Sequence, residues 1–227
     1  MTSVIAALCH SPLFAGLSDT TIEQEIMPYG KTQDYQKGQY LILPQQKVNK
    51  LGIVITGKIQ ILHIFSDGTQ SLMNTIREQG VLGADLVCTR TQRAPFHAIA
   101  AANTRIFYLP SSIIIETGTL REEVRQKILS QMLYLISREN MRKEYRLAIL
   151  SQKGLRERIL TYLTMQSERQ QKTTFTIPFS REEMASFLCV NRSALSHELG
   201  KLQKEGILSF RKNQFTLHGS PQNYARD

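Results

Sequence analysis

Cysteine is scarce in this sequence of 227 residues, which holds three, Cys9, Cys88 and Cys189. They lie far apart and form no CxxC pair, so the sequence predicts neither a disulfide framework nor a thiolate zinc site. Unpaired cysteines of this kind fit a reducing compartment. We therefore expect the protein to be cytoplasmic.

Long hydrophobic runs are also missing. No uncharged apolar stretch reaches the roughly 18 residues that a membrane-spanning helix needs. The N-terminus has no basic segment followed by an apolar stretch and a cleavage site. We therefore expect neither a membrane partner nor export.

Catalytic motifs are the third absence. The sequence contains no GxSxG, HExxH or P-loop pattern and no paired carboxylates at an informative spacing. The competing class is a metal enzyme of the cupin type, which needs clustered histidines with a carboxylate. The histidines here are scattered, at His10, His63, His97, His197 and His218. We expect no enzyme, no metal and no cofactor.

Positive charge is plentiful, with a formal net charge of +9. From Gln152 to the end, twelve Lys and Arg stand against seven Asp and Glu, which leaves +5 on this segment and +4 on the rest. A basic C-terminal part indicates a polyanionic partner, and the alternative is a solvated surface.

Residues 31–110 have an all-β pattern. Short apolar runs are interrupted by turn residues such as Thr56-Gly57, and the run after Gly57 alternates between apolar and polar residues. Asp67-Gly68 is a hairpin signal. We therefore expect these strands to form a β-sandwich or a β-roll.

Residues 120–150 contain no Gly or Pro and have helical spacing. One face predicts a coiled-coil seam and hence a dimer. A second face carries Ile128, Met132 and Leu135 and is free to lie on the β-domain. The alternative is a single amphipathic helix on its own core. The seam residues are Leu129, Leu133, Ile136, Asn140, Lys143, Leu147 and Leu150.

After a hinge at Lys153-Gly154, the pattern predicts a helix over residues 155–165 and a short strand that ends at Pro178. Ser180 and Glu183 have capping-box spacing, which starts one helix, and Asn191 caps a second. Residues 180–205 therefore form a helix-turn-helix, followed by a hairpin wing over residues 207–217.

At this point the chain resembles the Crp/Fnr family of bacterial regulators, related to the cyclic-AMP receptor protein. Four motifs agree in order and spacing: residues 13–18, the roll motif at residues 54–59, the long helix, and residues 191–196. The resemblance implies an α+β fold with a double-stranded β-helix (jelly-roll) domain, a dimerisation helix and a winged helix-turn-helix. The expected boundaries are residues 1–117, 118–151 and 152–227.

The resemblance also implies a homodimer whose second motif helix enters the major groove of double-stranded DNA and reads a palindrome. Arg192, Ser193, Ser196 and His197 then face the base edges, and Arg192 can offer two donors to a guanine. Well-known members carry Glu in place of Ser193 and Arg in place of His197, so the DNA word should differ. Candidates for contact with the DNA phosphates, which otherwise are caps or surface charges, are Ser180, Arg181, Lys201, Arg211 and Lys212. Asn191, the cap of the second helix, is a further DNA-binding candidate.

The effector site departs from the family pattern. Cyclic-nucleotide binders of the family use a Gly-Glu pair and an Arg-Ser/Thr pair, whereas this chain has Gly83, Asp85 and Arg93-Ala94. We expect another small-molecule effector, or none. Arg93 and Asn140 are ligand candidates, although Arg93 can equally be solvated and Asn140 can set the register of the seam.

Family members that bind an iron–sulfur cluster have several cysteines close together near the N-terminus, whereas Cys9 is alone there. We therefore expect no iron–sulfur cluster. A Crp/Fnr activator also touches RNA polymerase, which becomes a further expected partner. The alternative function is a ligand-binding regulatory subunit that acts through protein–protein contacts.

Overall fold

The computed structural model describes residues 3–218, which divide into two compact units, residues 3–140 and 141–218. The long helix α5 (Glu122–Leu150) contains the boundary. Each unit has its own hydrophobic core. Among the described helices, none combines the length and apolar character that crossing a membrane requires.

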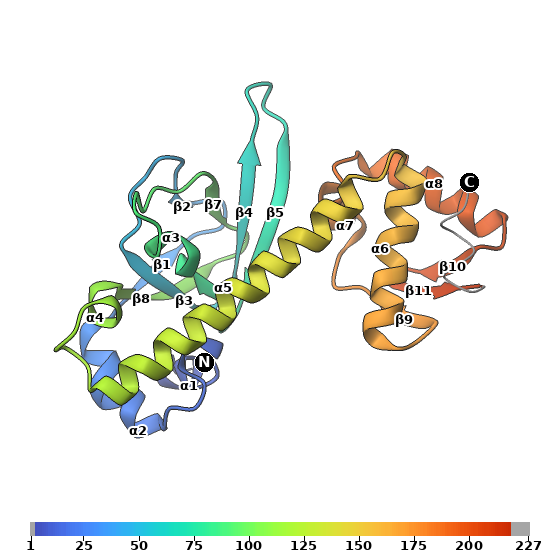
Figure 1. Ribbon diagram of the computed structural model, residues 1–227. Helices are drawn as coiled ribbons and strands as arrows, with labels where there is room; N and C mark the ends of the chain where they lie inside the picture. The colour runs from blue at the N-terminus through green and yellow to red at the C-terminus, as the bar shows by residue number, and fades with distance from the viewer. Residues whose placement is uncertain (1–2, 219–227) are drawn as a thin grey trace. The chain divides into compact units, whose positions relative to one another are not determined.

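The N-terminal unit is built from two antiparallel four-stranded sheets, ordered β1-β8-β3-β6 and β2-β7-β4-β5 (Figure 1). This arrangement confirms the predicted β-roll. The strands are β1 (Lys31–Tyr35), β2 (Tyr40–Ile42), β3 (Lys50–Thr56), β4 (Lys58–Ile64), β5 (Gln70–Arg77), β6 (Val81–Leu82), β7 (His97–Ala100) and β8 (Thr104–Pro110).

The β4–β5 hairpin extends beyond the other strands of its sheet (Figure 1). Its turn is the predicted one: Gly68 has a φ of 82°, which favours glycine, and the Asp67 carboxylate accepts hydrogen bonds from the amide and the hydroxyl of Thr69. The hairpin prediction from Asp67-Gly68 is therefore confirmed.

Short helical segments surround the roll. They are α1 (Val4–Cys9), α2 (Asp19–Thr21), α3 (Ala84–Val87) and α4 (Ser112–Ile115), with tighter or wider turns at Pro12–Phe14, Ile22–Ile26 and Met27–Tyr29.

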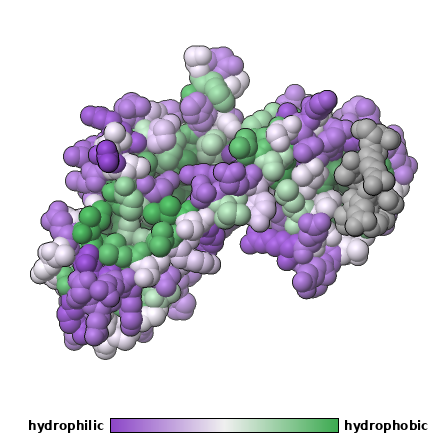
Figure 2. All heavy atoms as spheres, in the orientation of Figure 1, coloured by the Kyte–Doolittle hydropathy of each residue, from purple (hydrophilic) through white to green (hydrophobic). Residues whose placement is uncertain are grey.

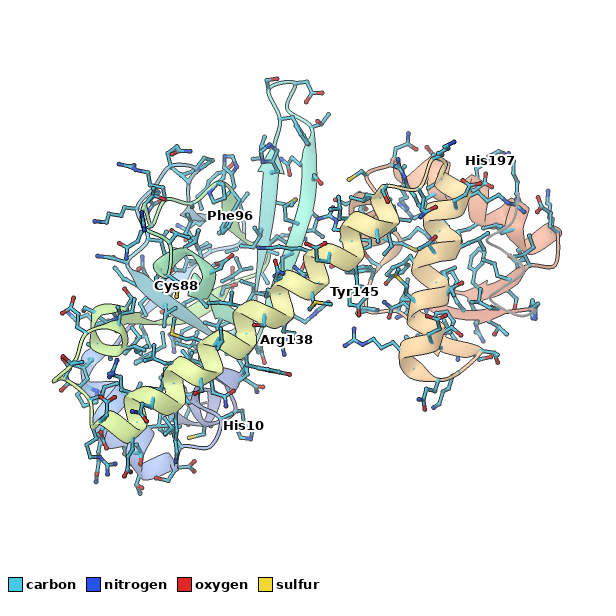
Figure 3. The ribbon with its side chains drawn as sticks, viewed as in Figure 1. His10, Cys88, Phe96, Arg138, Tyr145 and His197 are labelled. Atoms are coloured by element: carbon cyan, nitrogen blue, oxygen red, sulfur yellow. The ribbon has the colours of Figure 1, made fainter. Side chains whose placement is uncertain are left out.

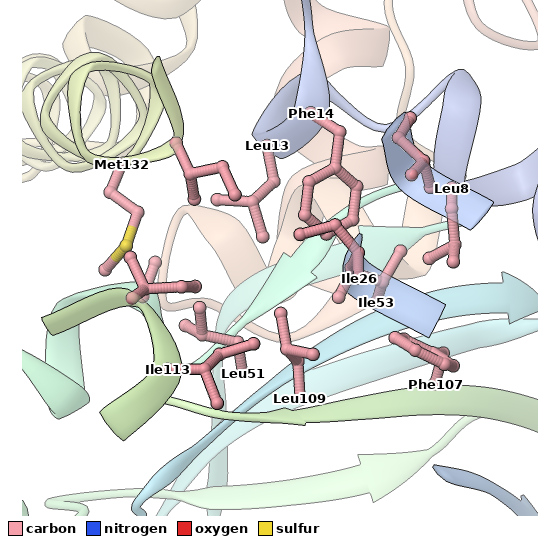
Figure 4. Packing of buried hydrophobic residues seen from close by; sticks show 14 of the residues in the cluster. Leu8, Leu13, Phe14, Ile26, Leu51, Ile53, Phe107, Leu109, Ile113 and Met132 are labelled. Carbon is pink, nitrogen blue, oxygen red and sulfur yellow. The ribbon is translucent and has the colours of Figure 1, made fainter. Parts of the chain in front are cut away.

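Strand β3 is buried on both faces, which explains its continuous apolar run. Val54 packs into the cluster between the sheets, whereas Ile53 packs into a second cluster under α1 and α5 (Figure 4). The second cluster includes Ile128, Met132 and Leu135, which are 0%, 2% and 5% exposed. The predicted roll-facing side of α5 is confirmed.

The C-terminal unit is a winged helix-turn-helix. Helix α6 continues five residues beyond the predicted end at Met165, because residues 166–170 are polar and favour a helix although the apolar periodicity has stopped. The elements after α5 are α6 (Leu155–Gln170), β9 (Thr174–Thr176), α7 (Arg181–Phe187), α8 (Arg192–Lys204), β10 (Leu208–Arg211) and β11 (Gln214–Leu217).

Candidate nucleic-acid interface

The turn between α7 and α8 depends on local hydrogen bonds. The Ser180 hydroxyl accepts from the Glu183 amide, and the Glu183 carboxylate accepts from the Ser180 amide, so the predicted capping box starts α7. Asn191 caps α8 by accepting from the Ala194 amide at 2.7 Å. Between the helices, Cys189 takes a left-handed backbone with a φ of 58°.

Helix α8 has one buried face and one exposed face. Leu195, Leu199 and Leu202 are 0% exposed and pack into the core of the unit. The four residues predicted to read base edges are all exposed on the remaining surface of α8, and His197 is labelled there in Figure 3. They are Arg192, Ser193, Ser196 and His197. Ser193 also donates its hydroxyl to the Asn191 side chain at 2.8 Å, so part of its hydrogen-bonding capacity is used locally.

Sequence reasoning missed Gly200. It lies inside α8, one turn after Ser196, and a Cβ added there would meet nothing within 4 Å. A glycine inside a helix costs about 1 kcal/mol relative to alanine. Nothing within the described residues occupies the space beside Gly200, so packing inside the unit does not require a glycine there. Its position among polar α8 residues was the available signal.

Arg181 is not free to reach outward. Its guanidinium lies over the rings of Phe210 and Phe215, and it donates a hydrogen bond to the Lys212 carbonyl at 3.0 Å. Burial is the main cause that lowers its pKa, and the nearby Arg192 charge contributes. This geometry favours wing packing over the phosphate contact expected from the sequence.

The other candidates for phosphate contact differ in availability. Ser180 serves as a cap, whereas Arg211 and Lys212 are exposed at the tip of the β10–β11 wing. Lys201 is exposed on α8, with its Nζ 3.7 Å from a Glu198 carboxylate oxygen. α8 and the wing therefore present an array of cations and neutral donors.

The expected effector residues all lie in the N-terminal unit. Gly83, with a φ of 87°, precedes α3 and Asp85 lies in its first turn, while Asn140 is exposed on α5. The Arg93 guanidinium donates to the Gln45 carbonyl at 2.7 Å. None of these residues lines the shallow cavity of about 440 Å³ formed by Gly57, Lys58, Arg77, Glu78 and Ala102. Within the described residues, no group of three or more potential metal ligands occurs.

Two family models match the chain. The Crp-like helix-turn-helix domain covers residues 157–219 and the cyclic nucleotide-binding domain covers residues 32–117. The Fumarate and nitrate reduction regulatory protein of Vibrio cholerae is 23% identical over 206 residues, which are 88% of this chain and 80% of that protein. The chain belongs to the Crp/Fnr family.

A further sequence relative supports the assignment, and two solved structures share the fold of this Crp/Fnr regulator. The Transcriptional activator protein anr of Pseudomonas aeruginosa is 24% identical, with 90% of this chain and 82% of that protein covered. The c-di-GMP responsive regulator CLP of Xanthomonas campestris has a TM-score of 0.66 at 16% identity, over 89% of this chain and 100% of that one. OCPA-complexed CprK has a TM-score of 0.61 at 20% identity, over 88% and 91%. The chain is a transcription regulator with a DNA-binding helix-turn-helix, and the family is not one of enzymes.

Proposed function

We propose that this Crp/Fnr regulator acts in the cytoplasm as a homodimer that reads a palindromic operator. The observation that carries the proposal is the exposed apolar surface of α5. Leu133 and Leu147 are 68% and 63% exposed although the same helix buries Ile128 and Met132 on its other side. Large apolar side chains in such numbers on one helix indicate a surface that is covered in the assembled protein. Tyr134, Met141 and Tyr145 are also exposed, on another side of the helix.

The exposed face of α5 is covered by the α5 helix of a second copy of the chain. Leu133, Asn140 and Leu147 recur every seven residues on the exposed face, the spacing by which two parallel helices pack. Hydrophobic residues also gather on the face of the N-terminal unit beside α5 in Figure 2. A dimer of this kind places two α8 helices for two half-sites about one helical turn, ~34 Å, apart.

The base-reading role belongs to α8. Arg192 lies at its first position, exposed, where an arginine can donate two hydrogen bonds to a guanine. Asn191, Ser193, Ser196 and His197 complete the surface that approaches the groove. The DNA phosphates are contacted by Lys201, Arg211 and Lys212. These contacts contribute affinity and its salt dependence but no sequence specificity.

The effector is a small molecule other than cyclic AMP. Asp85 has a shorter carboxylate than the family's Glu and lies one position later, and the residue after Arg93 is the buried Ala94, which has no hydroxyl to offer a phosphate. The similar regulator CLP is described as c-di-GMP responsive, and the similar structure of CprK is described as OCPA complexed. Gly83, Asp85, Arg93 and Asn140 stay our candidates for effector contact, and RNA polymerase stays a proposed partner.

The test is selection of bound duplexes from a random pool at near-physiological salt, without ligand and with a cell metabolite extract. A palindrome in both pools identifies a regulator that is competent without an effector. A palindrome only with extract identifies a small-molecule sensor. Enriched single half-sites would contradict the dimer, and no enrichment in either pool would favour the protein-binding regulatory subunit.

A further inference from the structure

Arg146 is a buried charge near the C-terminal end of α5. It is 8% exposed, and among the buried residues of the described chain it is the only charged one. Burial lowers its pKa from the usual arginine value. Removing a guanidinium from water costs free energy, and an apolar side chain of similar length would fill the same space without that cost. Stability alone therefore does not require arginine here.

The contacts of Arg146 converge on the end of α7 and the turn that follows it. Its Nε donates to the Phe187 carbonyl at 3.3 Å, and its guanidinium carbon lies 5.0 Å from the centre of the Phe187 ring. Its Nη2 lies 3.8 Å from the Cys189 Sγ. Phe187 is the last residue of α7, so a cation meets the negative end of that helix. Arg146 thus ties α5 to the turn that precedes α8.

The same helical turn of α5 carries part of the proposed dimer seam. Leu147, the seam residue that follows Arg146, is 63% exposed. Tyr145, which precedes Arg146, is 56% exposed on another side of the helix (Figure 3 labels Tyr145). Successive residues of a helix point about 100° apart, so these side chains leave the helix on other sides than Arg146. One turn of α5 therefore joins the surface that contacts the second copy to the turn that orients the recognition helix.

We propose that Arg146 is a positioning residue that sets the separation of the two recognition helices, and through it the one half-site spacing that the dimer accepts. The inference rests on the proposed dimer and palindrome. Changing the spacing by one base pair moves a half-site by about 3.4 Å and turns it by about 35°. A rigid link between seam and α8 rejects such sites, whereas a loose link accepts them.

The experiment repeats the duplex selection with wild type, Arg146→Met, Arg146→Lys and Ile159→Val, and scores the half-site spacings among enriched sequences. Ile159 is 0% exposed in the same core, so Ile159→Val loses about 0.5–1.5 kcal/mol of stability without touching the Arg146 contacts. We expect one spacing for wild type and Ile159→Val. Arg146→Met should select the same half-site sequence but accept neighbouring spacings, whose enrichment should lie within about threefold of that of the preferred spacing.

Lysine keeps the charge but loses the planar fork and the ring stack, so Arg146→Lys should broaden the spacings less. It also keeps the test decisive should Arg146→Met not fold. A single spacing in the folded Arg146 variants overturns the inference, as does a changed half-site word or equal broadening in Ile159→Val. A wild type that shows no palindrome overturns the proposed function instead.

Discussion

The guanidinium carbon of Arg181 lies 4.9 Å from the centre of the Phe210 ring, and the same side chain donates to the Lys212 carbonyl. Arg181 is the first residue of α7, whereas Phe210 lies in the wing strand β10. One side chain thus fastens the wing to the helix-turn-helix. The Arg181 guanidinium thus makes its contacts within the protein, unlike the exposed cations Arg211 and Lys212.

Arg181→Met should therefore loosen the wing. Loss of the ring stack and of the hydrogen bond should lower the unfolding free energy of the C-terminal unit by about 1–3 kcal/mol. The salt dependence of DNA affinity should stay as in wild type, because no phosphate contact is removed. Arg211→Ala is the matched control: Arg211 is exposed on the wing, so this variant should keep its stability and lose about one unit of salt slope. A flattened salt slope in Arg181→Met would return Arg181 to the phosphate contacts.

Arg192→Ala should act on sequence recognition. We expect a loss of about 1–3 kcal/mol on the selected palindrome and little loss on random duplexes, measured by fluorescence anisotropy at several salt concentrations. Lys201→Ala should weaken both duplexes alike and reduce the salt slope by about one. Equal losses of Arg192→Ala on the two duplexes would rule out base reading by Arg192.

Gly200→Ala should change stability and binding in opposite directions. Alanine favours the helix by about 1 kcal/mol over glycine, and its Cβ meets nothing in the described structure, so the melting temperature should rise. Its methyl group should obstruct the approaching duplex and lower the affinity. Calorimetry and a binding titration on one preparation measure both. A more stable variant that binds like wild type would place Gly200 outside the interface.

Leu147→Glu should separate the proposed dimer into monomers, because it puts a charge into the apolar seam of α5. Sedimentation velocity at micromolar concentration measures the shift in mass. Tyr29→Glu is the control, since Tyr29 is also a large exposed apolar residue, at 42%, but belongs to another element. A Leu147→Glu variant that sediments like wild type would contradict the seam.

The Cys9 thiol should react with alkylating agents only slowly at neutral pH. Burial, together with the Asp19 carboxylate, raises the pKa of the Cys9 thiol to about 11. At pH 8 only about one molecule in a thousand then carries the reactive thiolate, and the fraction should rise tenfold for each pH unit up to the pKa. Iodoacetamide labelling followed by peptide mass analysis should find Cys9 slower at pH 8 than at pH 10 by about a hundredfold. A rise of only about tenfold, as expected for a thiol of ordinary pKa, would contradict the raised pKa.

Much of the fold follows from local signals. The capping box at Ser180 and Glu183, the cap at Asn191 and the turn at Asp67-Gly68 depend on residues two or three positions apart, so they could be predicted at residue level. The buried, roll-facing side of the long helix and its exposed apolar residues, Leu133 and Leu147, both follow from periodicity alone. The exposed face of α8 follows in the same way, once its three buried leucines are recognised.

Contacts between residues far apart in the chain could be identified only from the tertiary structure. Sequence could assign Arg181 a positive charge, but only the folded wing brings Phe210 and Phe215 beneath it and gives this candidate phosphate ligand a packing role. Arg146 and Phe187 are 41 positions apart, and no local pattern announces their hydrogen bond. Periodicity specifies the side of a helix on which a residue lies. The partner on that side is decided by how the elements pack, because burial removes water and leaves each polar group to find its hydrogen bond within the fold.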